Sequence, residues 1–318
     1  MTTRLILDVD TGTDDAVAIF AAAGHPELEL LGVTVVNGNV ALKYTVENTL
    51  RVLDHMGSAV PVYAGAERPI VRPDFPVPRH VLNGGEDSDF QVNELDFPAS
   101  TTPAQTISAV RFLIDSYLAD GGDDIVLVAT GPLTNLALAL TAEPRLAARI
   151  PRLVIMGGAR GWGNVTAAAE FNFWVDPEAA EAVMSAGIRD VTIVPLDATH
   201  SAQLGFEDCD VFHAIGTPAG TGSADLIRHR IRNYPDDPAA TRLTAPVHDA
   251  LCIAALVHPE VLTELVDGSV HIETRGEFTL GEMVLDTRPW RTEPNNARVA
   301  LRADAQIFSR FLADAFRS

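Results

Sequence analysis

Four aspartates lie close together near the N-terminus, in the sequence DVDTGTDDA of residues 8–16. They are Asp8, Asp10, Asp14 and Asp15, and they directly follow a short apolar run. Two carboxylates about 4 Å apart repel each other by roughly 4 kcal/mol at an effective dielectric constant of 20. A stable fold can keep such a cluster if the charges point into water, share protons or surround a cation. The last arrangement would be useful for chemistry, because hard divalent cations prefer oxygen ligands.

Other parts of the chain could complete a metal site. Asp10 and Asp15 lie on one strand-to-helix turn, and a turn at a strand end, such as Thr130-Gly131-Pro132, can offer a backbone carbonyl. A further carboxylate, Asp249, occurs in the segment VHDA at 247–250. The sequence therefore contains suitable oxygen donors for a divalent cation, provided that the fold brings them together.

Each of these acids also has a purely structural interpretation. Asp14 and Asp15 would occupy the first turn of a helix, where the helix dipole favours negative charge. Asp249 would serve the same purpose before the apolar stretch 250–257, and the neighbouring His248 is compatible with a hydrogen-bonded structural role. Short motifs alone do not decide between these interpretations.

The segment AEFNFWVDPEAA at 169–180 combines polar and aromatic residues. Glu170 and Asn172 alternate with Phe171 and its aromatic neighbours, and such hydrogen-bonding side chains among aromatic rings favour a sugar or base pocket. Asp176 precedes a proline and a run of helix formers, so we expect it to cap the next helix.

A phosphohydrolase is an alternative interpretation of the N-terminal motif. The pattern D-x-D after an apolar strand is the signature of haloacid-dehalogenase-type phosphohydrolases, in which Asp8 would be the nucleophile and Asp10 the acid/base. That pattern expects Thr where this chain has Gly12, and a basic residue, usually Lys, well downstream. The only lysine, Lys43, comes too early, although an arginine could substitute. A Mg²⁺-dependent phosphohydrolase is thus disfavoured but stays open.

The glycine-rich segment 157–163 does not fit the dinucleotide-binding pattern G-x-G-x-x-G.

The composition predicts an acidic globular protein. The 318 residues are 47% hydrophobic and carry a net charge of −20. This length suits one large α/β domain over residues 1–318, and the negative charge argues against nucleic acids and anionic membrane surfaces as partners. Cys209 and Cys252 lack metal-ligand spacing, so we expect buried free thiols in a reducing cytoplasm. The N-terminus reaches Asp8 too soon for a signal peptide.

Alternating apolar runs and helical patterns predict the elements that position these residues. Strands are expected at 5–9, 30–36, 60–63, 125–129, 153–156 and 191–194, and helices at 16–23, 41–56, 104–118, 177–186 and 250–257. This alternation predicts an open, mostly parallel sheet flanked by helices on both faces. Ligands of such sheets bind beyond the carboxyl ends of the strands. The loops 10–15, 37–39, 130–135 and 157–164 should therefore converge on one rim.

Six blocks, in this order, resemble the nucleoside hydrolase family, the inosine-uridine-preferring N-ribohydrolases. They are DVDTGTDDA at 8–16, NGN at 37–39, ATGPLTNLA at 129–137, VIMGGA at 154–159, GNVTAAAEFN at 163–172 and VHDA at 247–250. The first looks like the family fingerprint D-x-D-x-G-x-D-D-A, and the blocks extend over essentially the whole chain. The resemblance implies a single α/β domain with a Rossmann-like core, a small-molecule ribonucleoside as substrate, and a homodimer or homotetramer.

The resemblance also implies roles for individual residues. A Ca²⁺ ion would be held by Asp10, Asp15, the backbone carbonyl of Thr130 and Asp249, with a water and the ribose 2′- and 3′-hydroxyls completing its coordination. The substrate would be bound by Asp14, Asn39 and Asn172 at those hydroxyls, by Asn164 and Glu170 at the 5′-hydroxyl, and by Met156 and Phe171 along the pocket. His248 would lie near the leaving base and take part in catalysis.

The implied reaction is hydrolysis of the N-glycosidic bond of a ribonucleoside to ribose and free base. Positive charge develops on the ribose in an oxocarbenium-like transition state, and preorganised carboxylates stabilise that charge. The metal would lower the pKa of its bound water, and Asp10 would accept the proton. Chelation of the ribose diol would place C1′ within reach of that water, and would explain a requirement for ribose over 2′-deoxyribose.

Departures from the family pattern fall on the side of the nucleobase. Family members commonly carry a His-Gly pair in the loop after the third strand, whereas here Asn83 takes the place of that histidine, with His80 nearby. The segment 233–246 also lacks the usual aromatic spacing, for which Tyr234 or Arg242 would have to substitute. The altered loop keeps open a third possibility, a non-catalytic ribose-binding homologue.

Overall fold

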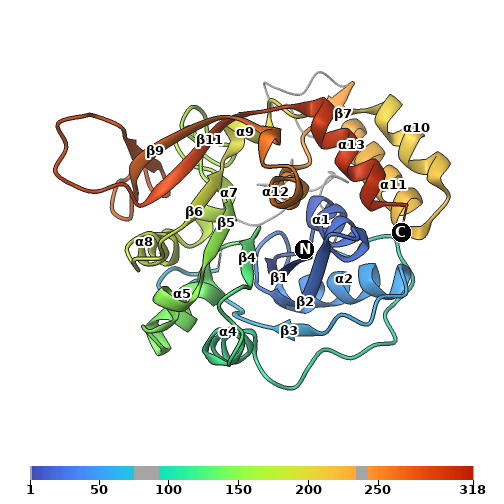
Figure 1. The fold of residues 1–318 in the computed structure, drawn as a ribbon, viewed down its shortest axis with the longest axis horizontal. Helices are drawn as coiled ribbons and strands as arrows, with labels where there is room; N and C mark the ends of the chain where they lie inside the picture. Colours follow the sequence, from blue (N-terminus) through green and yellow to red (C-terminus); the bar gives the residue numbers. More distant parts are fainter. Residues whose placement is uncertain (1, 75–92, 234–242, 318) are drawn as a thin grey trace.

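The strands of the computed structural model form a large sheet that runs through the middle of the molecule (Figure 1). The structure describes residues 2–74, 93–233 and 243–317. Within them the strands are β1 (Thr3–Val9), β2 (Leu28–Val35), β3 (Val62–Ala64), β4 (Val126–Ala129), β5 (Arg152–Met156), β6 (Val191–Val194), β7 (Leu204–Gly205), β8 (Thr244–Ala245), β9 (Leu262–Ile272), β10 (Met283–Asp286) and β11 (Ala297–Ala303). The helices are α1 (Thr13–Gly24), α2 (Leu42–His55), α4 (Ala109–Leu118), α5 (Thr134–Ala142), α6 (Leu146–Arg149), α7 (Phe171–Val175), α8 (Pro177–Met184), α9 (Leu196–Thr199), α10 (Phe206–Ile215), α11 (Pro218–Asn233), α12 (His248–Val257) and α13 (Ala305–Ala315).

The order of the strands defines where a ligand can bind. In the described residues the large sheet has the order β10-β9-β11-β6-β5-β4-β1-β2-β3. Every pair from β11 to β3 is parallel, whereas β9 pairs antiparallel with both β11 and β10. The part β3-β2-β1-β4-β5-β6 has the order of a doubly wound fold, which reverses between β1 and β4. The predicted mostly parallel sheet is confirmed, and in sheets of this kind ligands bind at the reversal, which here lies beyond the carboxyl ends of β1 and β4.

The parallel part of the sheet is largely buried on both faces, as a parallel sheet requires. Leu5, Leu7 and Val9 of β1 belong to the hydrophobic cluster that also includes residues of α1, α2, α12 and α13. Ile6 points to the opposite cluster, which includes residues of α4, α5 and α8. Because alternate residues of a strand face opposite sides, this two-sided burial explains why β1 is an unbroken apolar run.

Most predicted boundaries shift by a few residues at helix and strand ends. The helix expected at 16–23 begins at Thr13, which places Asp14 and Asp15 in its first turn as predicted. The helix expected at 104–118 begins only at Ala109, because the side chain of Ser108 accepts a hydrogen bond from the Arg111 backbone N–H and caps the first turn. Cys209 and Cys252 are buried and free, as expected.

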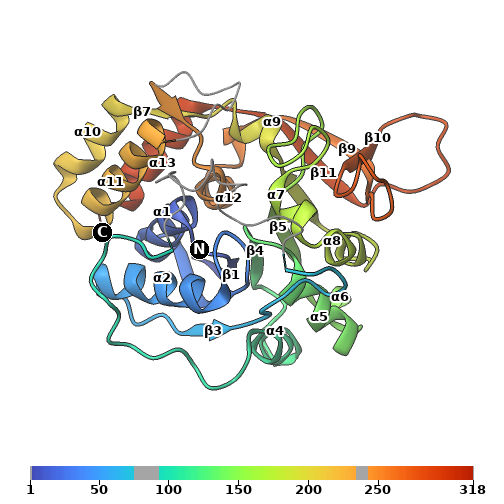
Figure 2. The same ribbon diagram turned by 180° about the vertical axis from the view of Figure 1, so that it is seen from behind.

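The C-terminal third adds features that the sequence patterns did not predict. The strands β9 and β10 extend into an arm that protrudes from the body at the end opposite to α10, α11 and α13 (Figures 1 and 2). Helix α11 packs against both α10 and α1. In the described residues, every helix is too short or too polar to cross a membrane.

Asp8 of β1 connects this strand to β2 and to helix α5. Its side chain is fully buried, and Oδ1 accepts hydrogen bonds from Thr34 Oγ1 of β2 at 2.5 Å and from Asn135 Nδ2 of α5 at 2.8 Å. Burial raises the pKa of Asp8 to about 6, although both hydrogen bonds act in the opposite direction. A carboxylate so enclosed is not open to a substrate, which argues against the phosphohydrolase interpretation with Asp8 as nucleophile.

We expect Thr34→Val to lower the free energy of unfolding by about 1–3 kcal/mol, because it removes a donor from a buried carboxylate without changing the side-chain volume much. Thr34→Ser keeps the hydroxyl and should lose less. Urea denaturation monitored by circular dichroism measures both. Equal stability of Thr34→Val and the wild type would show that this hydrogen bond does not hold the sheet together.

Candidate functional site

The carboxylate of Asp10 lies at the point where the strand order reverses. Asp10 directly follows β1, and its side chain is only 1% exposed. Two glycines from the neighbouring loops pack against it: a Cβ added to Gly38 would lie 1.9 Å from Asp10 Oδ2, and one added to Gly131 would lie 3.0 Å from Oδ1. Glycine is therefore needed in the NGN turn, because any side chain there would displace this carboxylate, and a side chain in the TGP turn would crowd it.

Asn39 joins Asp10 to Asp15. The backbone N–H of Asn39 donates to Asp10 Oδ2 at 2.6 Å, and its side-chain amide donates to the Asp10 carbonyl at 3.3 Å and to Asp15 Oδ2 at 3.2 Å. Asp15 also accepts from the backbone N–H of Gly12 at 3.0 Å and from Thr130 Oγ1 at 3.0 Å. The loops after β1, β2 and β4 thus converge, as the sequence predicted.

Asp14, Asp15 and Asp249 form a cluster suited to a cation. One carboxylate oxygen of each lies within 4.8 Å of the others, and all three residues are buried. Asp249 is in the first turn of α12, so its helix-capping position and its place in the cluster coincide. Sequence reasoning grouped Asp15 and Asp249 with Asp10, whereas the carboxylates that the structure brings closest to each other include Asp14.

The charges of this region favour a metal. Burial raises the pKa of Asp15 to about 7, with the neighbouring Asp14 adding to the effect. Burial also raises the pKa of Asp10 and of Asp249 well above the ordinary range, and nearby carboxylates raise both further. Without a counter-charge these groups must hold protons, and a hard divalent cation with oxygen ligands would replace those protons. The donor set therefore fits Ca²⁺ or a related ion.

Asn172 lies next to the predicted backbone ligand. Its side-chain amide donates to the Thr130 carbonyl at 2.7 Å and to the Met156 carbonyl at 3.1 Å, and its Nδ2 is 3.5 Å from Met156 Sδ. Both Asn172 and Met156 are buried. The structure therefore places these two predicted substrate-binding residues beside the end of β4.

Glu170 caps the short helix α7. Its carboxylate accepts from the backbone N–H groups of Asn172 at 2.9 Å, Phe173 at 3.3 Å and Gly158 at 2.9 Å. Burial raises its pKa to about 7 despite these hydrogen bonds. Asn164 is exposed, and its Oδ1 accepts from the backbone N–H of Phe171 at 3.0 Å. The four predicted residues of this segment are thus linked to the same rim through α7.

His248 is buried beside Asp249, with its Nδ1 2.7 Å from Thr199 Oγ1. Its ring centroid is 5.6 Å from that of His200. Burial lowers the pKa of His248 well below its ordinary value, and the positive charge of Arg230 and the neighbouring His200 lower it further. A neutral imidazole at this position can donate one hydrogen bond but carries no positive charge.

Four predicted site residues lie outside the described part of the chain, and one residue of the site was not predicted from the sequence. Asn83, His80, Tyr234 and Arg242 lie outside the described residues, so their roles on the base side stay predictions. Conversely, sequence reasoning missed Arg230, which contacts Asp14. The sequence did contain a sign of this residue, because a charged Arg230 occurs on the same helix face as the apolar Leu226, Ile227 and Ile231 of α11.

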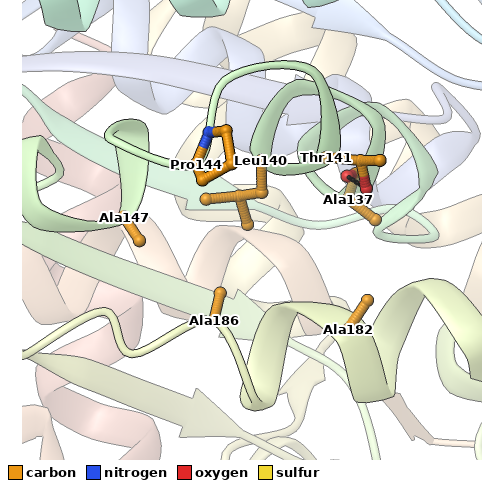
Figure 3. A pocket seen from close by; sticks show the side chains of 7 residues that line it. All are labelled: Ala137, Leu140, Thr141, Pro144, Ala147, Ala182 and Ala186. Atoms are coloured by element: carbon orange, nitrogen blue, oxygen red, sulfur yellow. Dashed lines mark hydrogen bonds between the residues drawn. The ribbon is translucent and has the colours of Figure 1, made fainter.

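A separate pocket lies between α5, α6 and α8 (Figure 3). It is lined by Ala137, Leu140, Thr141, Pro144, Ala147, Ala182 and Ala186. These side chains carry no titratable group, so they offer neither acid/base chemistry nor metal ligands. The acidic rim beyond β1 and β4 is the stronger candidate for a functional site.

The fold and the acidic rim define a doubly wound α/β protein with buried carboxylates at the strand-order reversal, an arrangement that suits metal-assisted hydrolysis. A sequence model of the family described as "Inosine-uridine preferring nucleoside hydrolase" matches residues 5–310. The chain belongs to this family of enzymes.

Similar proteins support the same assignment. The chain is 40% identical to the pyrimidine-specific ribonucleoside hydrolase RihA of Escherichia coli strain SE11 over 318 residues, which cover 99% of this chain and 98% of the relative. Among solved structures, the purine-preferring ribonucleoside hydrolase from Gardnerella vaginalis matches with a TM-score of 0.87 and 32% identity over 99% of both chains. An inosine-guanosine nucleoside hydrolase (IG-NH) matches with a TM-score of 0.82 and 29% identity over 98% of both chains.

We expect the metal-free protein to lose stability as the pH rises from about 4 to about 7. The unfolded chain releases the protons of its aspartates and glutamates near pH 4, whereas the folded chain holds those of Asp15 and Glu170 until about pH 7. The folded state therefore binds more protons in this window, and its stability falls with increasing pH. Ca²⁺ should restore stability most strongly above pH 7, where it no longer competes with protons.

Urea denaturation at pH 5 and at pH 7.5, with chelator or with Ca²⁺, measures this effect. The expected result is a denaturation midpoint that Ca²⁺ raises more at pH 7.5 than at pH 5. A urea denaturation midpoint at pH 7.5 that does not change when divalent cations are added would argue against a metal site among these carboxylates.

Proposed function

We propose that this protein hydrolyses the N-glycosidic bond of ribonucleosides to ribose and free nucleobase, acting as a single domain over residues 1–318. The observation that carries the proposal is the buried cluster of carboxylates at the strand-order reversal, in a chain that belongs to the nucleoside hydrolase family. A sugar that develops positive charge as its bond to the base breaks is the substrate that such a cluster would stabilise.

The proposed cofactor is Ca²⁺, held by Asp10, Asp15, the Thr130 carbonyl and Asp249. Hard oxygen donors of this kind suit Ca²⁺, and the hydrogen bond of Asn172 to the Thr130 carbonyl accounts for one of the two lone pairs of that oxygen. Bound Ca²⁺ would supply a fixed positive charge that binds vicinal hydroxyls and lowers the pKa of a nearby water.

Asp10 is the proposed general base that accepts a proton from the attacking water. Its position is fixed by the Asn39 backbone N–H and by the close approach of Gly38 and Gly131, so the carboxylate needs little reorganisation during the reaction. Asp14, Asn39 and Asn172 would bind the 2′- and 3′-hydroxyls of the ribose. These contacts hold C1′ in the orientation that the attack requires.

The remaining residues would orient the rest of the nucleoside. Glu170 and Asn164 are proposed to bind the 5′-hydroxyl, with Met156 and Phe171 along the pocket. His248 would donate a hydrogen bond to the departing base from Nε2 of a neutral imidazole, which requires Nδ1 to accept from Thr199 Oγ1. Asn83 is proposed to act on the same side.

We also propose that the protein works in the cytoplasm as a homodimer or homotetramer. The two buried free thiols suit a reducing compartment. Analytical ultracentrifugation of the purified chain tests the assembly, and a monomer at micromolar concentration would contradict it.

Asp10→Asn should fold normally and lower kcat by about 10³-fold or more, because an amide cannot accept the proton from water. Folding should persist because the amide oxygen can still accept the hydrogen bond from the Asn39 backbone N–H. Asp123→Asn, at an exposed position outside the site, is the matched control. Near-normal turnover by Asp10→Asn would overturn its assignment as the base.

A panel of ribonucleosides and 2′-deoxyribonucleosides, assayed for sugar release with Ca²⁺ and with chelator, tests the function itself. We expect release of ribose from at least one ribonucleoside, at least tenfold less from its 2′-deoxy counterpart because one hydroxyl contact is missing, and loss of activity in chelator. Phosphate release from phosphorylated substrates with Mg²⁺ would favour the phosphohydrolase instead. Calorimetric binding of ribonucleosides without hydrolysis over hours would favour a non-catalytic homologue.

A further inference from the structure

Arg230 is a buried cation that the proposed mechanism does not use. It lies on α11, is 3% exposed, and its guanidinium donates from Nη1 to Asp14 Oδ1 at 2.9 Å and to Thr13 Oγ1 at 2.8 Å. Its Nε donates to the Pro246 carbonyl at 3.0 Å. A buried arginine is unfavourable unless its charge is paired and its N–H groups are hydrogen-bonded, and these contacts meet both needs.

The ion pair selects one member of the acidic cluster. Among the described residues, Asp10, Asp15, Asp249 and Glu170 form no salt bridge with any lysine or arginine, whereas Asp14 pairs with Arg230. Asp14 is also the aspartate of the cluster that we assign to the sugar rather than to the metal. The positive charge of Arg230 thus pairs with Asp14, the proposed sugar-binding acid, and the other acids of the cluster stay available to a metal.

The contacts of Arg230 span both halves of the site. Thr13 and Asp14 begin α1, whereas Pro246 leads into α12, which carries His248 and Asp249 in its first turn. The close approach of α11 to α1 sets the reach of the guanidinium: a Cβ added to Gly222 of α11 would lie 3.2 Å from the ring of Phe20. Arg230 therefore fixes the start of α1 relative to the start of α12.

We propose that Arg230 is a positioning residue for the ribose. It binds Asp14 through Oδ1, which leaves Oδ2 to accept from a ribose hydroxyl. This inference rests on the proposed function, because it assigns Asp14 to the sugar. Arg230 acts through Asp14 and need not touch the substrate.

Arg230→Met tests this role with a side chain of similar length and no charge. We expect kcat/KM for a ribonucleoside to fall on the order of 30-fold, the factor that corresponds to loss of a hydrogen bond to a charged group, with most of the change in KM. Arg230→Lys keeps the charge beside Asp14 but cannot also reach the Pro246 carbonyl, so it should lose less than tenfold. Arg228→Met is the matched control, since Arg228 lies on the same helix and pairs with Asp210 and Asp225 at the surface.

A double-mutant cycle with Asp14→Asn separates positioning from mere stabilisation. If Arg230 acts through Asp14, its substitution should change kcat/KM little once Asp14 is asparagine, whatever the melting temperature does. Independent, multiplicative effects of the two substitutions would overturn the proposal, as would kinetics of Arg230→Met within threefold of the Arg228→Met control. If Arg230→Met does not fold, the same cycle with Arg230→Lys decides by the same criterion.

The wild-type assay keeps the two proposals distinguishable. A wild-type protein that releases no ribose from any ribonucleoside contradicts the proposed function. A wild-type protein that does so, beside an Arg230 variant whose effect is independent of Asp14, contradicts only the role of Arg230.

Discussion

Mutual repulsion among buried carboxylates is the constraint on which the site depends. Asp10, Asp14, Asp15, Asp249 and Glu170 are each less than 9% exposed. For Asp10, Asp15, Asp249 and Glu170, desolvation raises the pKa and favours the neutral form. The chain offsets this cost in several ways: backbone N–H groups bind Asp10, Asp15 and Glu170, and a guanidinium binds Asp14. These contacts do not neutralise all of the charge. The remaining negative potential is what makes the rim suited to a divalent cation and to a sugar that becomes positively charged.

The topology makes this concentration of charge possible. Reversal of the strand order between β1 and β4 separates their following loops, so side chains can enter the crevice without being covered by a crossover helix. The glycines at positions 38 and 131 then allow two backbone turns to approach Asp10 closely. Asp8 lies two residues before Asp10, and its hydrogen bonds to Thr34 and Asn135 connect β1 with β2 and α5. The same fold that buries the acids therefore also fixes where they point.

Local patterns were enough to predict the half of the fold that positions the acidic rim, but not the rest. The strands before Val194 are short, apolar and separated by clear turns, so their alternation with helices revealed the parallel sheet. Strands β9 to β11 pair antiparallel or across a long separation in sequence, and no local signal fixes that pairing. Arg230 illustrates the same limit at the site. Its place on an apolar helix face was visible in the sequence, but its partner Asp14 is 216 residues away and only the tertiary packing of α11 on α1 brings them together.

The division between the ribose side and the base side follows from how each is built. The rim that we propose to bind ribose consists of turns that directly follow buried strands, and it is cross-linked by hydrogen bonds from Asn39, Asn172 and Arg230. Proteins that share this fold nevertheless have names that specify different bases: pyrimidine-specific, purine-preferring and inosine-guanosine. A rim that binds only the ribose, as proposed above, cannot by itself select the base, because ribose is what all ribonucleosides have in common. Under the proposed function, selection would come from residues beyond the rim, among which His248 has its Nδ1 2.7 Å from Thr199 Oγ1. A buried, neutral histidine can hydrogen-bond to a purine or to a pyrimidine, so His248 alone would not choose between them.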